Sequence, residues 1–579
     1  MQTGSQAGDH PPSAASTPDL LHFREEAGKD VIPSETGSVL VETGFFYELG
    51  ASLRDSGPEL LSAAQNPVNL ALGTAGLLAC GAGLVGAHHA TGPLLCTAHD
   101  ALFRQPGEVR IGYRPLGAFG RVPLYLPLSD RFTGLQMVAP MGQAKTSTME
   151  WLAYQDLRNG LSVFVVETEG DLGRKLLPLA LWLDVPIRYF TYSGTNAGST
   201  MKWNPLAGDK VDAAERAVTA FQSAAASGDE KFFENFNSMF LRHSVLAVCT
   251  YFERRDRVAT MSDLDRFVQN ESFRRKVLGV ERDSQGRRFT VNAKGLPRRT
   301  HGYWEDLYYG QYGQRERTQF VAGLHAVMDA LLAQEIVEVA LSPQEGDPIL
   351  DLTEALTSPG LTLVSVPQGA APATSRMLST WVMEYFRQAV LARPDGGYPV
   401  SAYLDEVHSM LGHANSEAAL AFSSLITQSR RRHVAFNFAY QSFSLLPSPL
   451  KEALATNARN KLISGGQQGD DAAEAMRLLG QTEREVRDYR TTRKGLLGGP
   501  GSFSVGRRSQ TVPRVSEEDL VYLPRGWWHC SRVRRGKQQR PVPVKAGRAP
   551  TPPKKYREVF AARETDDNSE AHSEQEEVA

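Results

Sequence analysis

The chain has 579 residues, of which 41% are hydrophobic and 22% are charged, the composition of an ordinary globular protein of several domains. Lys and Arg together number 63 against 65 Asp and Glu, which gives a net charge of −2. Global charge therefore does not indicate nucleic-acid binding, and any such evidence must be local. Cys80, Cys96, Cys249 and Cys530 lack the spacing of metal ligands. This favours a reducing, cytoplasmic setting without a zinc site.

The first 90 residues divide into two segments. Residues 1–65 open with a stretch rich in Ser, Gly, Pro and acids and have no charged signal-peptide start, so we predict a disordered or variable N-terminus. Residues 66–87 contain no charge and just reach the roughly 20 residues that a membrane helix needs. A soluble helix rich in Ala and Gly is equally compatible, because these residues contribute little transfer free energy. Both interpretations of residues 66–90 stay open: a single membrane anchor holding the chain at the cytoplasmic face, or a cytoplasmic protein.

A candidate phosphate-binding loop follows. An apolar run ends at Ala139, a short loop comes next, and Lys145-Thr146 open a segment of helical pattern that ends at Gly160. Strand, tight turn and helix N-terminus is the order that a phosphate loop requires. Lys145 would contact the β- and γ-phosphates of ATP, and the Thr146 hydroxyl would hold Mg²⁺. The pattern G-x-x-x-x-G-K-[ST] is met in part, since Ala139 and Ala144 replace its glycines. The predicted nucleotide-binding residues are Pro140, Met141, Gly142, Gln143, Ala144, Lys145, Thr146 and Ser147.

Apolar runs of strand length alternate with helical patterns on both sides of a central interruption. The runs are 109–113, 122–128, 135–138, 162–167, 187–192, 361–366, 400–405, 434–440 and 461–464. This alternation predicts a doubly wound parallel α/β sheet. We expect residues 105–210 to form the first part of a nucleotide-binding domain and 346–525 the second. Residues 211–345 show helical patterns with a basic stretch at 282–299, which predicts an inserted all-α domain.

The C-terminal region has strongly biased charge. Residues 525–557 contain eleven Lys and Arg and no acid, whereas 564–579 are acidic. Charge runs are usually solvated, so we predict a basic and then acidic disordered tail over 526–579. A phosphate-backbone or membrane-surface patch is the functional alternative for the basic part, and a docking tail for the acidic part.

Three further positions suggest chemistry. Asp405 and Glu406 end the apolar run at 400–405, where one carboxylate would ligate Mg²⁺ and the other would activate the attacking water. Gln441 ends the run at 434–440, where an amide can hydrogen-bond the γ-phosphate and the lytic water. Arg430 precedes that run and is a candidate arginine finger acting across a subunit boundary. Its alternative is a solvated cation at a helix C-terminus.

Taken together, this order of elements resembles the TraG/TraD-type coupling ATPases of conjugation and type IV secretion, relatives of the HerA/FtsK DNA translocases. The resemblance covers roughly residues 105–525 and is far more specific than any single motif. The elements that carry it are the phosphate loop, Glu167-Thr168-Glu169-Gly170-Asp171-Leu172, Trp203-Asn204-Pro205-Leu206, the helical insertion, Tyr403-Leu404-Asp405-Glu406, Arg430 and Gln441.

The resemblance implies a RecA-like core in a homo-hexameric ring that uses ATP and Mg²⁺ to drive single- or double-stranded DNA through a channel. It also implies a membrane anchor, a relaxase or relaxosome as partner, and other type IV secretion components. Lys145 and Thr146 would bind nucleotide and Mg²⁺, and Asp405 with Glu406 would form the Walker B pair. Gln441 would be the sensor, and Arg430 would face the neighbour's nucleotide.

The chain departs from the family pattern at a few positions. Ala144 replaces the glycine beside Lys145, where backbone comes closest to phosphate. Glu167 and Glu169 stand where the family usually has the Asp and Lys of Asp-Pro-Lys-Gly. These departures motivate an alternative function, a catalytically impaired scaffold that docks substrate at a secretion or mobilisation complex. A further alternative is a soluble HerA-like translocase in DNA processing.

Overall fold

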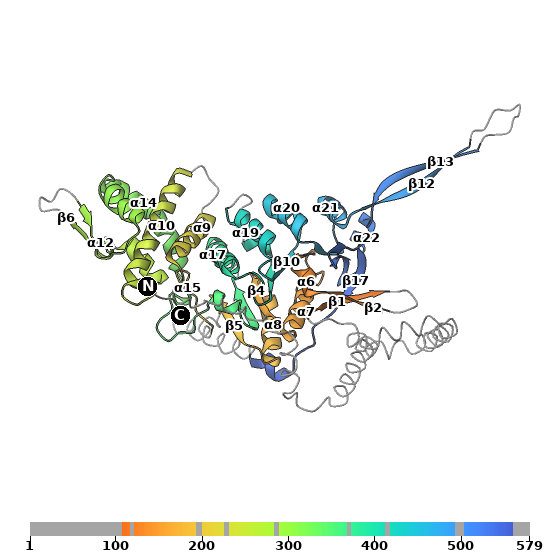
Figure 1. The fold of residues 1–579 in the computed structure, drawn as a ribbon, viewed down its shortest axis with the longest axis horizontal. Helices are drawn as coiled ribbons and strands as arrows, with labels where there is room; N and C mark the ends of the chain where they lie inside the picture. The colour runs from red at the N-terminus through yellow and green to blue at the C-terminus, as the bar shows by residue number, and fades with distance from the viewer. Residues whose placement is uncertain are drawn as a thin grey trace, which may run out of the picture. The chain divides into compact units, whose positions relative to one another are not determined.

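An eleven-stranded sheet is the centre of the fold (Figure 1). The computed structural model describes residues 107–115, 121–192, 200–224, 231–282, 289–366, 372–410, 417–491 and 503–559. The predicted N-terminus (1–65), the possible membrane helix (66–90) and the acidic end (564–579) lie outside these ranges. Within them, no helix is both long and apolar enough to cross a membrane.

Seven neighbouring strands of the sheet are parallel, in the spatial order β11-β3-β10-β9-β4-β8-β5. Their bounds are β3 Leu135–Val138, β4 Ser162–Glu167, β5 Ile187–Thr191, β8 Gly360–Ser365, β9 Val400–Asp405, β10 Val434–Tyr440 and β11 Asn460–Ser464. All residues of β3, β4, β8, β9, β10 and β11 are buried, as expected for parallel strands covered on both faces. The predicted doubly wound parallel sheet is confirmed.

Helices cover both faces, and the side chains of each strand alternate between two cores. Val163 and Val165 of β4 face one cluster, whereas Phe164 and Val166 face the other. Phe164 stacks on Phe386, with ring centroids 4.2 Å apart. The helices of this part are α6 Leu128–Arg131, α7 Lys145–Arg158, α8 Asp171–Trp182, α16 Leu352–Ala355, α17 Pro372–Ala392, α18 Val407–Met410, α19 Glu417–Gln428, α20 Ser448–Asn457 and α21 Gly469–Leu479, with a 3₁₀ turn at Phe443–Leu445.

The segment between β5 and β8 is largely helical. Its elements are α9 Lys210–Ala224, α10 Lys231–Glu253, α11 Met261–Gln269, α12 Glu271–Leu278, β6 Val280–Arg282, β7 Phe289–Val291, α13 Arg298–Gly302, a π-helix Tyr303–Tyr309, α14 Gln314–Leu332 and α15 Glu335–Leu341. Helical patterns predicted this content, but the short β6-β7 hairpin was not expected. Trp203, just before α9, packs edge-on against Trp381 of α17, so the insertion shares its core with the sheet's helical layer.

The C-terminal region differs most from prediction. Four antiparallel strands extend the sheet beyond β11 in the order β2-β1-β17-β14. They are β1 Val109–Pro115, β2 Arg121–Leu126, β14 Trp527–Ser531 and β17 Val542–Ala546. The predicted disordered tail is therefore wrong for residues 527–546. Its many cationic residues concealed two strands whose Trp528, Cys530 and Val544 are buried. In β17 the buried Val544 stands between the exposed Pro543 and Lys545, as in a half-buried strand.

A second unpredicted element is a long hairpin. Strands β12 Gln481–Thr491 and β13 Phe503–Pro513 pair with each other along eleven positions and form a sheet of their own. Their sequences are mostly charged and polar, without the regular alternation that predicts a half-buried strand. The short helix α22 Glu517–Val521 then leads into β14, and a small hairpin, β15 Val533–Arg534 with β16 Lys537–Gln538, follows it.

Substitution of Trp528 tests whether residues 527–546 belong to the sheet. We expect Trp528→Ala to lower the free energy of unfolding by about 3–5 kcal/mol, because the indole is fully buried between sheet and helices and its removal leaves a cavity. Thermal and chemical denaturation followed by circular dichroism measures the loss. Trp527→Ala is the matched control, because Trp527 is only half-buried and its loss should cost well under half as much. Equal, near-zero effects at both positions would mean that the segment does not belong to the sheet.

Candidate functional site

The strand register brings the predicted chemical residues to one edge of the sheet. Val138 at the end of β3 pairs with Tyr440 of β10 and Ile463 of β11, and Ala439 of β10 pairs with Asp405 of β9. The carboxyl ends of these parallel strands therefore coincide, which is where open α/β sheets bind ligands. The loop after β3, Asp405-Glu406 after β9 and Gln441 after β10 all lie at this edge.

The predicted loop connects β3 to α7 as a tight turn. Gly142 has φ 82° and Ala144 has φ 68°, both in the left-handed region. Ala144 is the residue before helix α7, so the backbone N–H groups of Lys145, Thr146 and Ser147 in the first turn have no acceptor within the helix. Pro140 and Thr146 are half-buried, whereas Met141 is 84% exposed at the tip. The turn thus presents helix N–H groups in the way that anion sites do.

Lys145 lies between the two acids. Its Nζ forms an ion pair with Glu406 Oε1 and lies 3.1 Å from Asp405 Oδ1. All three side chains are largely buried, with 11% exposure for Lys145 and 6% and 4% for the acids. Gln441 Nε2 donates to the same Glu406 oxygen at 3.0 Å. Four residues singled out from sequence therefore form one connected cluster.

Two details of this cluster could not be expected from sequence. Glu406 adopts φ 55°, a conformation that a non-glycine residue keeps only where its surroundings hold it, often at functional sites. His408 Nδ1 lies 3.4 Å from Glu406 Oε2. Burial, and then the charge of Lys145, lower the pKa of His408 below its ordinary value, so the imidazole is neutral at pH 7 and Lys145 is the cation facing Glu406.

A buried amide beside the loop was also missed by sequence reasoning. Gln467 follows β11, is 1% exposed, and has no hydrogen-bond partner for either amide atom among the described residues. Its neighbour Gly466 packs against the loop, because a Cβ there would lie 3.5 Å from Gln143 Nε2. The buried Gln143 Oε1 is likewise unpartnered in the described part of the chain. Buried polar atoms without partners need an explanation, and a ligand held by the loop would supply one.

Glu167 ends β4 at the same edge, next to β9. Its Oε2 accepts a hydrogen bond of 2.9 Å from the Gly173 N–H in the first turn of α8. Burial raises the pKa of Glu167 to about 7, and the charge of Asp405 adds to the rise, against the lowering effect of the backbone hydrogen bonds. Glu169, the other departure from the family pattern, is exposed. The N-terminus of α8 thus holds Glu167, which is the buried acid of the two.

Arg430 lies away from this cluster. It is exposed and precedes β10, whereas Gln441 follows it. Seven residues of strand span about 23 Å, so Arg430 is at the opposite edge of the sheet from the phosphate loop of its own chain. The structure does not bring Arg430 together with the other predicted site residues.

The residues present fit a nucleotide with Mg²⁺. The helix N-terminus and Lys145 offer positive charge to phosphate, and Thr146 and Asp405 offer the hard oxygen ligands that Mg²⁺ prefers. Asp405 Oδ1 and Glu406 Oε2 make no hydrogen bonds among the described residues, and around Gly142 a Cβ would meet nothing within 4 Å. Open space therefore lies beside carboxylate oxygens that Lys145 and His408 contact without a hydrogen bond.

The strand order and the loop define a RecA-like P-loop fold, with β10 lying between the loop strand β3 and the acidic strand β9. A bacterial conjugative coupling protein, TrwBdeltaN70 in its unbound form, has this fold: it is 14% identical, the match covers 75% of this chain and 88% of that one, and the TM-score is 0.52. TrwB with the GTP analogue GDPNP matches at 14% identity over 74% and 88% of the two chains, with a TM-score of 0.51. No protein-family model and no curated protein matches the chain. At this identity the likeness establishes the fold, and the resemblance predicted from sequence is confirmed at that level.

The raised pKa of Glu167 predicts a pH dependence of stability. The pKa rises from 4.5 to about 7 on folding, so the protonated carboxyl's contribution is complete below pH 4.5 and is lost as the pH rises through 7. Each pKa unit is worth about 1.4 kcal/mol, which makes the expected loss at most about 3.5 kcal/mol. Glu167→Gln should remove this loss, so that its melting temperature exceeds that of the wild type at pH 8.5 but not at pH 4.5. Glu169→Gln is the control and should follow the wild type at both pH values; a Glu167→Gln curve parallel to wild type would contradict the assignment.

Proposed function

We propose that this chain is an ATPase that couples nucleotide hydrolysis to the movement of DNA, or of a DNA–protein substrate, in conjugation or type IV secretion. The observation that carries the proposal is the cluster of Lys145, Asp405, Glu406 and Gln441 at the carboxyl edge of the sheet. Bound ATP with Mg²⁺ would supply the phosphoanhydride bond and a divalent charge. Everything else in the mechanism is the work of the chain's own side chains.

Each side chain of the cluster has a separate task. The helix N-terminus and Lys145 bind phosphate charge, and Thr146 with Asp405 holds the metal. Glu406 takes the proton of the attacking water as general base. Gln441 orients that carboxylate through the 3.0 Å hydrogen bond to its Oε1. Because Gln441 continues β10, a change at Glu406 is passed directly to a central strand of the sheet.

The pairing of Lys145 with both acids also makes hydrolysis dependent on ligand. While the ammonium neutralises Glu406, the carboxylate is a weaker base, since a nearby cation favours its ionised form. Phosphate charge competes for the same ammonium. Release of Lys145 from Glu406 therefore accompanies occupation of the loop, and the general base becomes available when there is a substrate to act on.

DNA as substrate, a homo-hexameric ring, a relaxase or relaxosome as partner and association with the cell membrane are further parts of the proposal. They are supported by the order of sequence elements and by the shared fold with a protein described as a bacterial conjugative coupling protein. TrwB has been solved with ADP and Mg²⁺ at a TM-score of 0.50 to this chain, which supports ATP and Mg²⁺ as the ligands here.

The ATPase proposal is tested by Glu406→Gln. Loss of the general base should lower kcat at least 100-fold while ATP binding persists, because Lys145 and the helix N-terminus are unchanged. Phosphate release with and without single- and double-stranded DNA measures the rate, and the wild-type rate should rise with DNA. Glu169→Gln, an exposed acid at the same edge, is the matched control. A wild type that binds ATP without hydrolysing it would favour the scaffold function, and unchanged turnover in Glu406→Gln would end the assignment.

The position of Arg430 predicts that it acts on a neighbouring subunit. At the edge opposite its own loop it serves only another chain's nucleotide, so Arg430→Ala should lower kcat by about 10³-fold or more with little change in ATP affinity. Lys145→Ala should abolish turnover by a different route. Mixing the two inactive variants should restore activity, because a Lys145→Ala subunit still offers Arg430 to an intact loop. Arg431→Ala is the control for a nearby exposed charge; absence of recovery on mixing would argue against the trans arrangement.

A further inference from the structure

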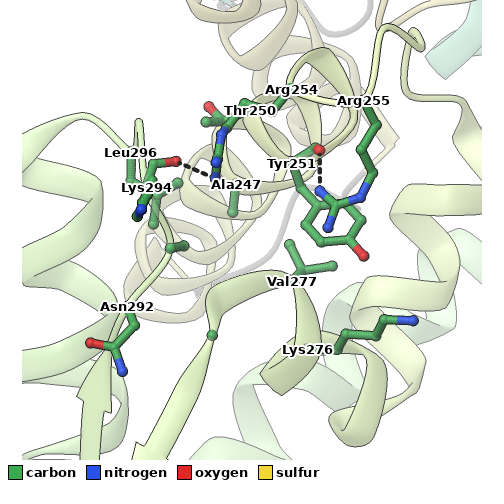
Figure 2. Close-up of a pocket in the computed structure, with 12 residues that line it drawn as sticks. Ala247, Thr250, Tyr251, Arg254, Arg255, Lys276, Val277, Asn292, Lys294 and Leu296 are labelled. Atoms are coloured by element: carbon green, nitrogen blue, oxygen red, sulfur yellow. Dashed lines mark hydrogen bonds between the residues drawn. The ribbon is translucent and has the colours of Figure 1, made fainter.

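A cavity of about 170 Å³ lies in the helical insertion, far in sequence from the phosphate loop (Figure 2). Three segments form it: the C-terminal end of α10 with the turn that follows, the C-terminal half of α12 up to Gly279, and residues 292–296 after β7. One water accounts for about 30 Å³ of liquid. The cavity therefore has room for a group larger than a few waters, yet is too small for a folded segment.

The cavity wall carries a concentration of positive charge. Arg254, Arg255, Lys276 and Lys294 all line it, and none of its lining residues is acidic. In the described part of the chain, none of these four cations lies within ion-pair distance of a carboxylate. Four cations without a matching anion repel one another, so the arrangement favours an anionic occupant.

Some other cations of the same insertion are matched with acids. Arg242 pairs with Glu215 at 2.8 Å, and Arg274 pairs with Glu271 at 2.5 Å. Arg275 pairs with the same glutamate at 2.9 Å. Arg298 and Arg315 of the insertion also lie in no ion pair among the described residues, so what marks the cavity is that four cations and no acid line one space.

The guanidinium groups at the cavity are held in place. Arg254 Nη1 lies 3.4 Å from the Lys294 carbonyl oxygen, to which it donates. Arg255 Nη1 donates to the Tyr251 carbonyl at 2.8 Å, and its guanidinium carbon is 3.5 Å from the centre of the Tyr251 ring. Figure 2 draws both hydrogen bonds. Fixed donors lose less conformational entropy on binding than free arginines do.

A buried hydroxyl at the cavity points to a ligand independently of charge. Thr250 is 3% exposed and lines the cavity, and its Oγ1 has no hydrogen-bond partner among the described residues. A buried hydroxyl without a partner costs about 1–3 kcal/mol. An oxygen-rich ligand in the cavity would accept this hydrogen bond as well as those of the cations.

We propose that this cavity binds a phosphate group of a single-stranded nucleic acid. A phosphate accepts hydrogen bonds from several sides at once, which suits a cavity whose cations come from three segments. The proposal rests on the proposed function in one respect, since it makes the insertion a contact site for the translocated strand. The site itself is argued from the cavity, its unmatched cations and Thr250.

Binding of a fluorescein-labelled oligothymidine to the full chain, in the absence of nucleotide, tests the site. The double variant Arg254→Gln/Lys294→Gln should lower affinity at least tenfold at 0.1 M salt. The slope of log affinity against log salt should also become shallower by about one to two, the change expected for the loss of one or two phosphate contacts. The matched control is Arg298→Gln/Arg315→Gln, two exposed cations of the same insertion outside the cavity. It should change affinity less than threefold. Equal losses in the two double variants would overturn the proposal.

Two further arms separate the chemistry from general electrostatics. Thr250→Val should weaken binding about threefold without changing the salt dependence, because the hydroxyl carries no charge. Inorganic phosphate should compete with the oligonucleotide on the wild type but not with the residual binding of Arg254→Gln/Lys294→Gln. A glutamate-rich peptide of equal charge that competes as well as the oligonucleotide would overturn the assignment to phosphate.

The outcome is distinguishable from failure of the proposed function. Basal ATP hydrolysis without DNA should be the same in the cavity variants and the wild type, because the cavity is remote from Lys145 and Glu406. If the wild type hydrolyses ATP and the cavity variants bind oligonucleotide like their control, the cavity proposal alone fails. If the wild type lacks hydrolysis but phosphate binding still depends on Arg254 and Lys294, the translocase proposal alone fails.

Discussion

The contact of Lys145 with Asp405 and Glu406 depends on the whole sheet. The lysine and Glu406 are 261 positions apart in sequence, and they meet because β3, β10 and β9 are parallel, adjacent and aligned at their carboxyl ends. Two buried carboxylates side by side are costly unless a cation neutralises them. The charge of the acid pair is therefore balanced either by the lysine or by a cation that replaces it, so the state of the site follows what the loop holds.

A second buried network keeps the acid strand in register with the loop helix. Arg131 Nη1 lies 2.5 Å from Asp156 Oδ1 of α7, and the Tyr403 hydroxyl of β9 donates to Asp156 Oδ2 at 2.5 Å. A buried ion pair of this kind is expensive to break, because one charge would be left uncompensated. Lys145 begins α7 and Asp405 ends β9. Because the network joins this helix to this strand, it fixes the position of Lys145 relative to Asp405. The positions of the site residues at the edge of the sheet therefore depend on polar contacts in the core.

The sequence predicted an element well where consecutive residues share the same environment, as in a strand buried on both faces. It predicted poorly where a residue's environment is made by contacts that only the fold creates. Strands β4, β9 and β10 were found because strands buried on both faces are continuously apolar. Strands β14 and β17 were missed because they lie within residues 525–557, where eleven cations and no acid outweighed the few apolar residues. His408 was missed because its contact with Glu406 depends on the path of the turn after β9. Gln467 was missed because its position beside the phosphate loop depends on the pairing of β11 with β3.

The departure at Ala144 shows how much a loop pattern can vary while keeping its conformation. The glycine that the pattern expects here serves two purposes, a left-handed backbone and close approach to phosphate. Ala144 adopts the left-handed conformation with φ 68°, at a cost of about 1–2 kcal/mol. Since Lys145 still reaches both acids and α7 still begins at Lys145, the substitution changes the energy of the turn and leaves its path intact. Ala144 thus meets the conformational requirement for glycine at the cost of strain. The second purpose of the glycine, close approach to phosphate, depends on whether the Cβ of Ala144 leaves room for the ligand.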